Sequence, residues 1–216
     1  MTPRLEILPE TQRRLWDELS CIPRHFVLYG GTSLALRFAH RESEDFDFFT
    51  TDQIDPETLR DEIVILKNAE LIQGAPNTAG FIVDRGGAVK VSFFGGLSMG
   101  RVGEPERCDD NRVCVASTLD VAVQKLKVVQ GRAAAKDYLD IAALLRNGVS
   151  LDTALGAALT LYPEFSPSVA LRALTFYNDG DLSTIPHDDR AELTEAVRLV
   201  GELPTLKRAN DRLECD

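Results

Sequence analysis

Short apolar runs separated by turn residues fill the first half of the chain, which is the pattern of strands in a sheet. Residues 26–29 form an apolar run that stops at two glycines. In residues 45–49 acidic and aromatic residues alternate, so strand geometry places both acids on one face. Further β-prone runs lie at 71–72, 80–83, 88–94 and 113–115, the last as an edge strand, and residues 84–87 have the composition of a hairpin turn. These runs predict a mixed sheet.

Apolar residues at helical spacing dominate the second half of the chain. The expected helices there cover residues 119–129, 133–146, 151–161, 168–176 and 188–200. The first half is expected to add helices at 9–19, 33–38 and 56–67, the last with Asp55 as its cap and Pro56 in its first turn. The fold class predicted is α+β, with a sheet-and-helix core over residues 1–116 and a helical region over residues 117–216 packed on that core.

The two glycines, Gly30 and Gly31, stand between the first strand and a short helix for which Thr32 is the expected N-cap. A glycine turn that leads into a helix N-terminus presents unpaired N–H groups, and no Cβ keeps a phosphate away from them. Gly30, Gly31, Thr32 and Ser33 are therefore the predicted phosphate-binding residues.

The alternating strand carries Asp45 and Asp47, two carboxylates that repel each other unless a cation neutralises them. Hard oxygen ligands of this kind suit Mg²⁺, or Mn²⁺, bound together with substrate phosphates. A glycine turn and an Asp-x-Asp pair are each common as structural features, but their order here is more specific and predicts a metal-dependent nucleotide site. Arg41 and Ser43 lie on the approach to the acids, where Arg41 can pair either with phosphate or with Glu44 and Asp45.

The chain has 216 residues, 44% of them hydrophobic, and a formal net charge of −10. The charge disfavours nonspecific binding of nucleic acid over the whole surface but permits a local basic groove. One group of residues is a candidate for such a groove: Lys125, Lys127, Arg132 and Lys136. For most of these four residues, a solvated helix face is the alternative interpretation.

Compartment and redox state are predicted from what the sequence lacks. There is no run of eighteen apolar residues, and the first residues lack the basic and apolar regions of a signal peptide, so we expect a cytoplasmic protein that does not bind membranes. The four cysteines, at positions 21, 108, 114 and 215, show neither zinc-site spacing nor a disulfide framework, and we expect them to be reduced.

The glycine turn and the acid pair together resemble the polymerase-β-like nucleotidyltransferases and, within them, the abortive-infection AbiE-type toxin family. That family's signature is similar to residues 30–36 followed by His40, Arg41, Ser43, Asp45 and Asp47. The resemblance covers roughly residues 24–146. It implies a nucleotidyltransferase core that uses a nucleoside triphosphate and Mg²⁺ to transfer a nucleotide to an acceptor hydroxyl. It also implies a toxin with a possible cognate antitoxin, and an acceptor that is RNA, such as tRNA, or protein.

A second group of charged residues lies in the helical half. Taken alone, Lys136 and Asp140 are an ordinary i,i+4 pair and Asp137 is a surface residue. The resemblance implies instead that Lys125 holds nucleotide phosphate and that Asp137 supports catalysis, with Asp140 as the alternate.

The sequence departs from the wider superfamily at Ser92, where a third carboxylate would stand. Either Asp137 or Asp140 supplies that ligand, or one Mg²⁺ suffices with the nucleotide's phosphates completing its shell. Asp84 is a third candidate for the ligand, though a hairpin turn explains this residue more simply. Two alternative functions stay open. One is a catalytically degenerate protein that binds nucleotide or a partner. The other is a small-molecule nucleotidyltransferase of the aminoglycoside type, because an acidic protein suits a cationic acceptor.

Overall fold

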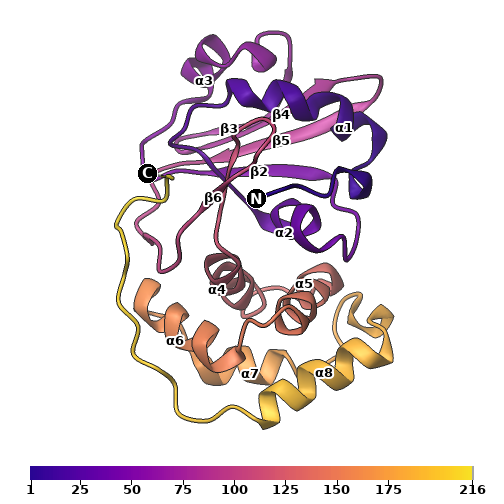
Figure 1. The fold of residues 1–216 in the computed structure, drawn as a ribbon, viewed down its shortest axis with the longest axis vertical. Coiled ribbons are helices and arrows are strands. Elements are labelled where there is room, and N and C mark those ends of the chain that lie inside the picture. The colour runs from indigo at the N-terminus through magenta and orange to yellow at the C-terminus, as the bar shows by residue number, and fades with distance from the viewer. Residues whose placement is uncertain (216) are drawn as a thin grey trace. The chain divides into compact units, whose positions relative to one another are not determined.

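The computed structural model describes residues 1–215, and the chain divides into two compact units (Figure 1). The first unit consists of residues 1–117 together with the stretch that begins at Asn210. The second unit consists of residues 118–209. The first contains the sheet, and the second is built from helices.

Within the described residues, seven strands form one sheet in the order β3-β4-β5-β2-β1-β7-β6. β2 pairs in parallel with β5 and antiparallel with β1, and β1 pairs in parallel with β7. The strands are β1 (Val27–Tyr29), β2 (Asp45–Phe49), β3 (Glu70–Ala75), β4 (Thr78–Asp84), β5 (Ala88–Phe94), β6 (Glu106–Arg107) and β7 (Cys114–Val115). This mixed sheet with helices confirms the predicted α+β class.

Three α-helices accompany the sheet in the first unit's described residues: α1 (Glu10–Trp16), α2 (Gly30–Phe38) and α3 (Pro56–Glu62). The carboxylate of Asp55 accepts hydrogen bonds from the N–H groups of Glu57 and Thr58, so the predicted cap of α3 is confirmed. Both α1 and α3 are shorter than the sequence pattern indicates, because each is followed by a 3₁₀ turn, at Asp17–Cys21 and Val64–Leu66.

The two faces of β2 have different surroundings. Phe46 and Phe48 are fully buried in a core with side chains of the N-terminal helical segment, among them Trp16 and Leu19. Asp45, Asp47 and Phe49 alternate with them and are partly exposed. We call this second surface, which carries Asp45 and Asp47, the acid face of the sheet. Strand alternation thus separates the core from the predicted chemistry.

The second unit's described residues form five α-helices: α4 (Thr118–Val128), α5 (Ala135–Arg146), α6 (Leu151–Leu161), α7 (Pro167–Ala173) and α8 (His187–Arg198). A 3₁₀ turn at Leu182–Thr184 precedes α8. α4 packs against α5 and α6, and α5 also packs against α8. α6 has the predicted bounds because Ser150 caps it, its Oγ accepting from the N–H of Thr153.

The chain end returns to the sheet unit, where Arg101 and Asn210 form a β-bridge. A disulfide joins Cys114 of β7 to Cys215, 101 residues later, with their Cα atoms 6.1 Å apart. The expectation of four reduced cysteines is therefore wrong for this pair, since spacing along the chain did not reveal how close the two residues lie. β7 is also not an edge strand, because β6 pairs with its outer side.

None of the helices in the described residues is both long and apolar enough to span a membrane.

Candidate active site

The turn between β1 and α2 requires glycine at its first position for two reasons. Gly30 has φ +70°, a left-handed conformation that side chains rarely adopt. A Cβ at this position would also lie 2.8 Å from Oδ2 of Asp47. The backbone of the turn therefore touches one of the two predicted metal ligands.

The second glycine brings the approach residues to the same place. A Cβ on Gly31 would overlap the guanidinium of Arg41 and lie 2.9 Å from Oγ of Ser43. Arg41 also donates a hydrogen bond from Nη1 to the carbonyl oxygen of Glu42, at 2.8 Å. The structure thus gathers Gly30, Gly31, Arg41, Ser43 and Asp47 around one turn.

The hydroxyl groups of Thr32 and Ser33 point into the protein. Thr32 Oγ1 donates to the carbonyl oxygen of Asp45, and Ser33 Oγ donates to that of Gly30 at 2.7 Å. Both side chains are fully buried. The prediction of Thr32 as N-cap is wrong, because α2 already begins at Gly30 and Tyr29 occupies the cap position. Both hydroxyls are engaged in hydrogen bonds that stabilise the turn. These residues can therefore bind a phosphate through their backbone N–H groups.

The acid face carries ordered rows of side chains across three strands. Asp45 stands beside Lys90 of β5, whose Nζ lies 3.6 Å from Oδ2 of Asp45. Asp47 stands between Tyr29 of β1 and Ser92 of β5. The register therefore puts Ser92 next to Asp47, which is where a third carboxylate would have completed the acid pair. Sequence reasoning missed Lys90, although its alternation with Ser92 along β5 marks both as members of this face.

The donor set on this face fits a metal ion bound jointly with a substrate. Asp45 and Asp47 supply hard oxygen ligands from one side of a strand. Among residues 1–215, no three or more His, Cys, Asp or Glu side chains gather as a metal site. Mg²⁺ typically takes one or two protein carboxylates and completes its shell with water and phosphate, so two acids beside a phosphate-binding turn suit it. Asp84 is explained structurally, because its Oδ1 accepts from the N–H groups of Gly86 and Gly87 in the hairpin.

The helical unit contains a compact cluster of charges, three of which are buried. Nζ of Lys125 lies 2.9 Å from Oδ1 of Asp137 and 2.7 Å from Oδ2 of Asp140. Nη2 of Arg132 lies 2.7 Å from the other oxygen of Asp137. Both carboxylates are 0% exposed, whereas Lys136 is exposed. The interpretation of Lys136 and Asp140 as a surface pair beside an exposed Asp137 is therefore wrong.

The i,i+3 spacing of Asp137 and Asp140 on α5 turns both carboxylates toward Lys125 on α4. Buried Lys125 and the half-exposed Arg132 together balance the two buried carboxylates, which is how buried charges are tolerated. The predicted site residues thus form two groups, one around the glycine turn and one around Lys125, and each group lies together within its own unit.

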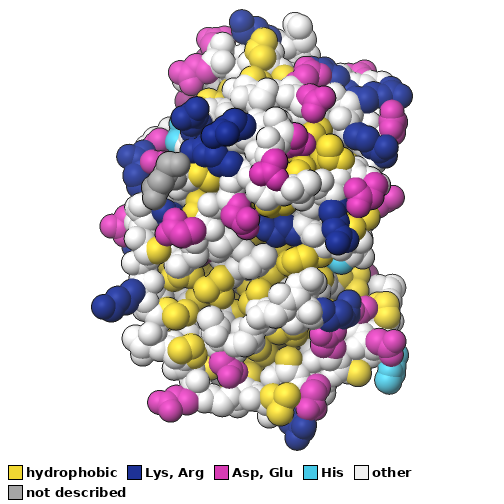
Figure 2. All heavy atoms as spheres, viewed as in Figure 1, with side chains coloured by type: hydrophobic (Ala, Val, Ile, Leu, Met, Phe, Trp, Pro, Cys, Tyr) yellow, Lys and Arg dark blue, Asp and Glu magenta, His cyan; other side chains and the backbone are white. Residues whose placement is uncertain are grey.

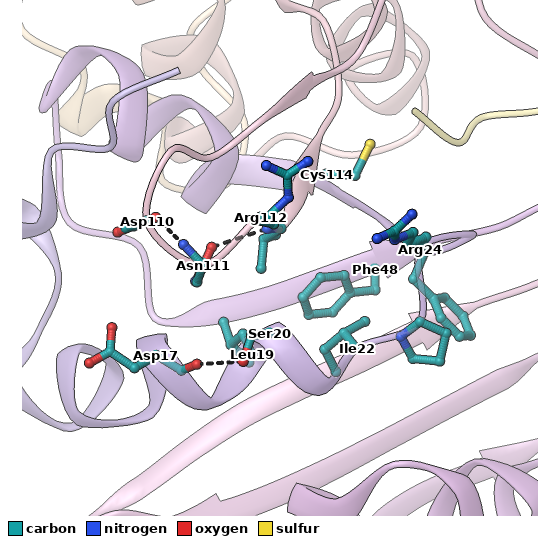
Figure 3. Close-up of a pocket in the computed structure, with 13 residues that line it drawn as sticks. Asp17, Leu19, Ser20, Ile22, Arg24, Phe48, Asp110, Asn111, Arg112 and Cys114 are labelled. Atoms are coloured by element: carbon teal, nitrogen blue, oxygen red, sulfur yellow. Dashed lines mark hydrogen bonds between the residues drawn. The ribbon is translucent and has the colours of Figure 1, made fainter. Parts of the chain in front are cut away.

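A separate cavity of about 470 Å³ lies in the sheet unit (Figure 3). Phe48 contributes to its wall, so the cavity opens on the face of β2 opposite Asp45 and Asp47. Acidic side chains, Asp17 and Asp110, and basic ones, Arg24 and Arg112, stand around it. It contains none of the predicted site residues, and the candidate active site therefore rests on the acid face and not on this cavity.

The glycine turn at the start of α2 thus lies against Asp47, one of the two acids of β2. A family model described as "Nucleotidyl transferase AbiEii toxin, Type IV TA system" matches residues 15–203. The chain belongs to this family, and the resemblance found in the sequence is confirmed.

Two individual proteins are also similar. An uncharacterized protein, aq_aa25, of Aquifex aeolicus (strain VF5) is 29% identical over 157 residues, which cover 71% of this chain and 74% of that protein. The crystal structure of an antigenic nucleotidyltransferase-like protein from Paracoccidioides brasiliensis is similar with a TM-score of 0.44 at 16% identity, over 82% of this chain and 85% of that one.

Proposed function

We propose that this protein transfers a nucleotide from a nucleoside triphosphate to an acceptor hydroxyl, with Mg²⁺ or Mn²⁺ as cofactor, as the toxin of a toxin–antitoxin pair. The observation that carries the proposal is the contact between the Gly30 turn and Asp47. A phosphate held at the turn is then adjacent to the acid pair, so the two halves of the site can act on one substrate.

The triphosphate is bound by backbone N–H groups at the start of α2, where the helix dipole favours negative charge. Arg41 and Ser43 lie against Gly31 and add donors to the same place. Lys125 remains the predicted phosphate ligand of the helical unit. Asp137 and Asp140 are both engaged with its ammonium, so in this proposal they position Lys125.

Asp45 and Asp47 would hold the metal ion, which when bound supplies charge neutralisation at the transferred phosphoryl group and at the leaving oxygen. The acceptor oxygen forms a bond to the α-phosphorus as the bond to pyrophosphate breaks. The hydroxyl proton passes to a carboxylate of the acid face or to solvent. Lys90, beside Asp45, keeps a positive charge next to the acids.

The acceptor in this proposal is RNA, such as tRNA, or protein, as family membership implies. Lys and Arg side chains gather in places on the molecular face drawn in Figure 2, so the acidic net charge leaves local positive surface for an anionic acceptor. The same net charge keeps an aminoglycoside-type acceptor as a second candidate.

The proposal is tested by incubating the purified protein with each α-³²P-labelled nucleoside triphosphate and Mg²⁺. Separate reactions contain total tRNA, an aminoglycoside, or no added acceptor. Asp47→Asn removes one metal-binding charge at constant size, and we expect it to lower transfer by at least ~10²-fold. Asp61→Asn, at an exposed position of α3, is the matched control and should transfer like the wild type.

Label that moves to tRNA or to protein in an Asp47-dependent way supports the proposal and identifies the acceptor class. Label on the aminoglycoside alone would favour the small-molecule enzyme. Equal transfer by wild type and Asp47→Asn would rule out the acid pair as the metal site. Nucleotide binding without any transfer would favour the degenerate binding protein.

A further inference from the structure

Two phenylalanines on the acid face lie outside the core of the sheet unit. Phe49 in β2 and Phe94 in β5 are partly exposed. On the opposite face, Phe46, Phe48 and Phe93 are fully buried and fill the core. Phe49 and Phe94 therefore place apolar rings next to the charged and polar groups of the candidate active site.

The two rings are held in one arrangement by a third. The Phe49 and Phe94 ring centroids are 5.2 Å apart, with the ring planes at 69°. The Tyr29 ring stacks on Phe49 at 4.7 Å with an interplanar angle of 14°. Tyr29 itself is only 1% exposed, so it supports Phe49 from within. We call Tyr29, Phe49 and Phe94 the aromatic platform.

The platform lies one strand repeat from the acid pair. Asp47 pairs with Ser92, and Phe49 pairs with Phe94, in adjacent rows of the same parallel register. Same-face neighbours on a strand are about 7 Å apart. This is roughly the span of the ribose that separates the α-phosphate of a nucleotide from its base.

Tyr29 connects the platform to the phosphate-binding turn directly. It supports Phe49 with its ring, lies opposite Asp47, and is followed in the chain by Gly30. A single molecule with its phosphates at the turn can therefore place its other end on the platform. This connection favours the incoming nucleotide over the acceptor as the occupant.

We propose that the aromatic platform binds the base of the nucleoside triphosphate by stacking, an inference that rests on the proposed function. Because every base has a π-face, stacking tolerates all four nucleotides, and the larger purines gain more from it than pyrimidines. The exposed surface of Phe49 and Phe94 is then the base-contacting part of the site.

The test separates binding of the base from binding of the phosphates. Calorimetry in Mg²⁺ buffer without acceptor compares ATP, UTP and inorganic tripolyphosphate as ligands. We expect Phe49→Leu and Phe94→Leu to weaken ATP binding about 10-fold, UTP binding less, and tripolyphosphate binding not at all. Phe49→Tyr, which keeps the ring, should bind ATP like the wild type. Phe176→Leu, which replaces a ring 46% exposed in the helical unit, is the matched control.

The outcomes distinguish failure of the aromatic platform from failure of the nucleotide site on which the platform rests. If ATP binds the wild type and both leucine variants equally, the platform is wrong and the nucleotide site stands. If the leucine variants weaken ATP and tripolyphosphate to the same extent, the rings act by supporting the turn, and base stacking is again wrong. If neither ligand binds the wild type, the proposed function fails and the platform with it. Thermal melting of each variant confirms that the compared proteins are folded.

Discussion

At the scale of single residues, the two glycines of the turn show how much chemistry depends on a missing side chain. Gly30 is constrained by both its backbone conformation and its approach to Asp47. Gly31 is constrained only by the approach of Arg41 and Ser43. The sequence predicted that this turn would admit a phosphate. It did not predict which neighbours fill the space beside each glycine, because these come from residues ten or more positions away.

This difference gives a prediction for the two alanine variants. Gly30→Ala should lower the free energy of unfolding by about 1–3 kcal/mol, since alanine is strained at positive φ. Gly31→Ala should change stability less but should weaken nucleotide binding, because the new methyl group displaces the Arg41 guanidinium. Urea denaturation and ATP calorimetry measure the two effects. Gly201→Ala, at a position where an added Cβ meets no neighbour, should alter neither.

At the scale of elements, the best predictions came from segments whose pattern has one explanation. β2 and β5 have the expected bounds at 45–49 and 88–94, because polar and apolar residues alternate over most of each run and turn residues flank both. The two-residue strand β6 is too short to show any period and was missed. The burial of Asp137 was also missed, since a helix surface pattern alone does not show which charged side chains find a buried partner.

The α4–α5 charge cluster should be sensitive to removal of one partner. Lys125→Met leaves buried carboxylates without their shared ammonium, and we expect it to destabilise the protein by about 3–5 kcal/mol. Lys136→Met, at an exposed position on α5, should cost less than about 0.5 kcal/mol. Chemical denaturation of both variants tests this. Equal, small losses would mean that the buried pairing contributes little to stability.

The Lys125→Met variant also tests the role that family resemblance implies for Lys125. If it refolds and its ATP affinity matches that of Lys136→Met, Lys125 has a structural role and does not hold phosphate.

At the scale of the whole molecule, both units contain thiol or phenol groups whose protonated form is favoured by burial. Burial raises the pKa of the Cys108 thiol from 9.0 to about 12. Burial likewise raises the pKa values of Tyr138 and Tyr162 from 10.0 to about 12. The unfolded chain ionises these groups first, so the stability they contribute is complete below about pH 9 and is lost as the pH approaches 12.

We therefore expect the melting temperature to fall steadily between pH 9 and pH 12, as measured by circular dichroism. Cys108→Ala should reduce the first part of this fall, because the thiol has the lowest ordinary pKa of the three. A melting temperature that stays constant to pH 11 would contradict the assignment.

The disulfide between Cys114 and Cys215 changes the covalent connectivity of the chain. The bond closes a ring that contains all of residues 118–209, so the helical unit is an insert within a loop and not a tail. A protease that nicks an exposed turn between two of these helices would open the ring without dividing the protein. The two pieces would stay joined by sulfur and would part only in a reducing environment. Cleavage within the helical unit would thus release no fragment as long as the disulfide is intact.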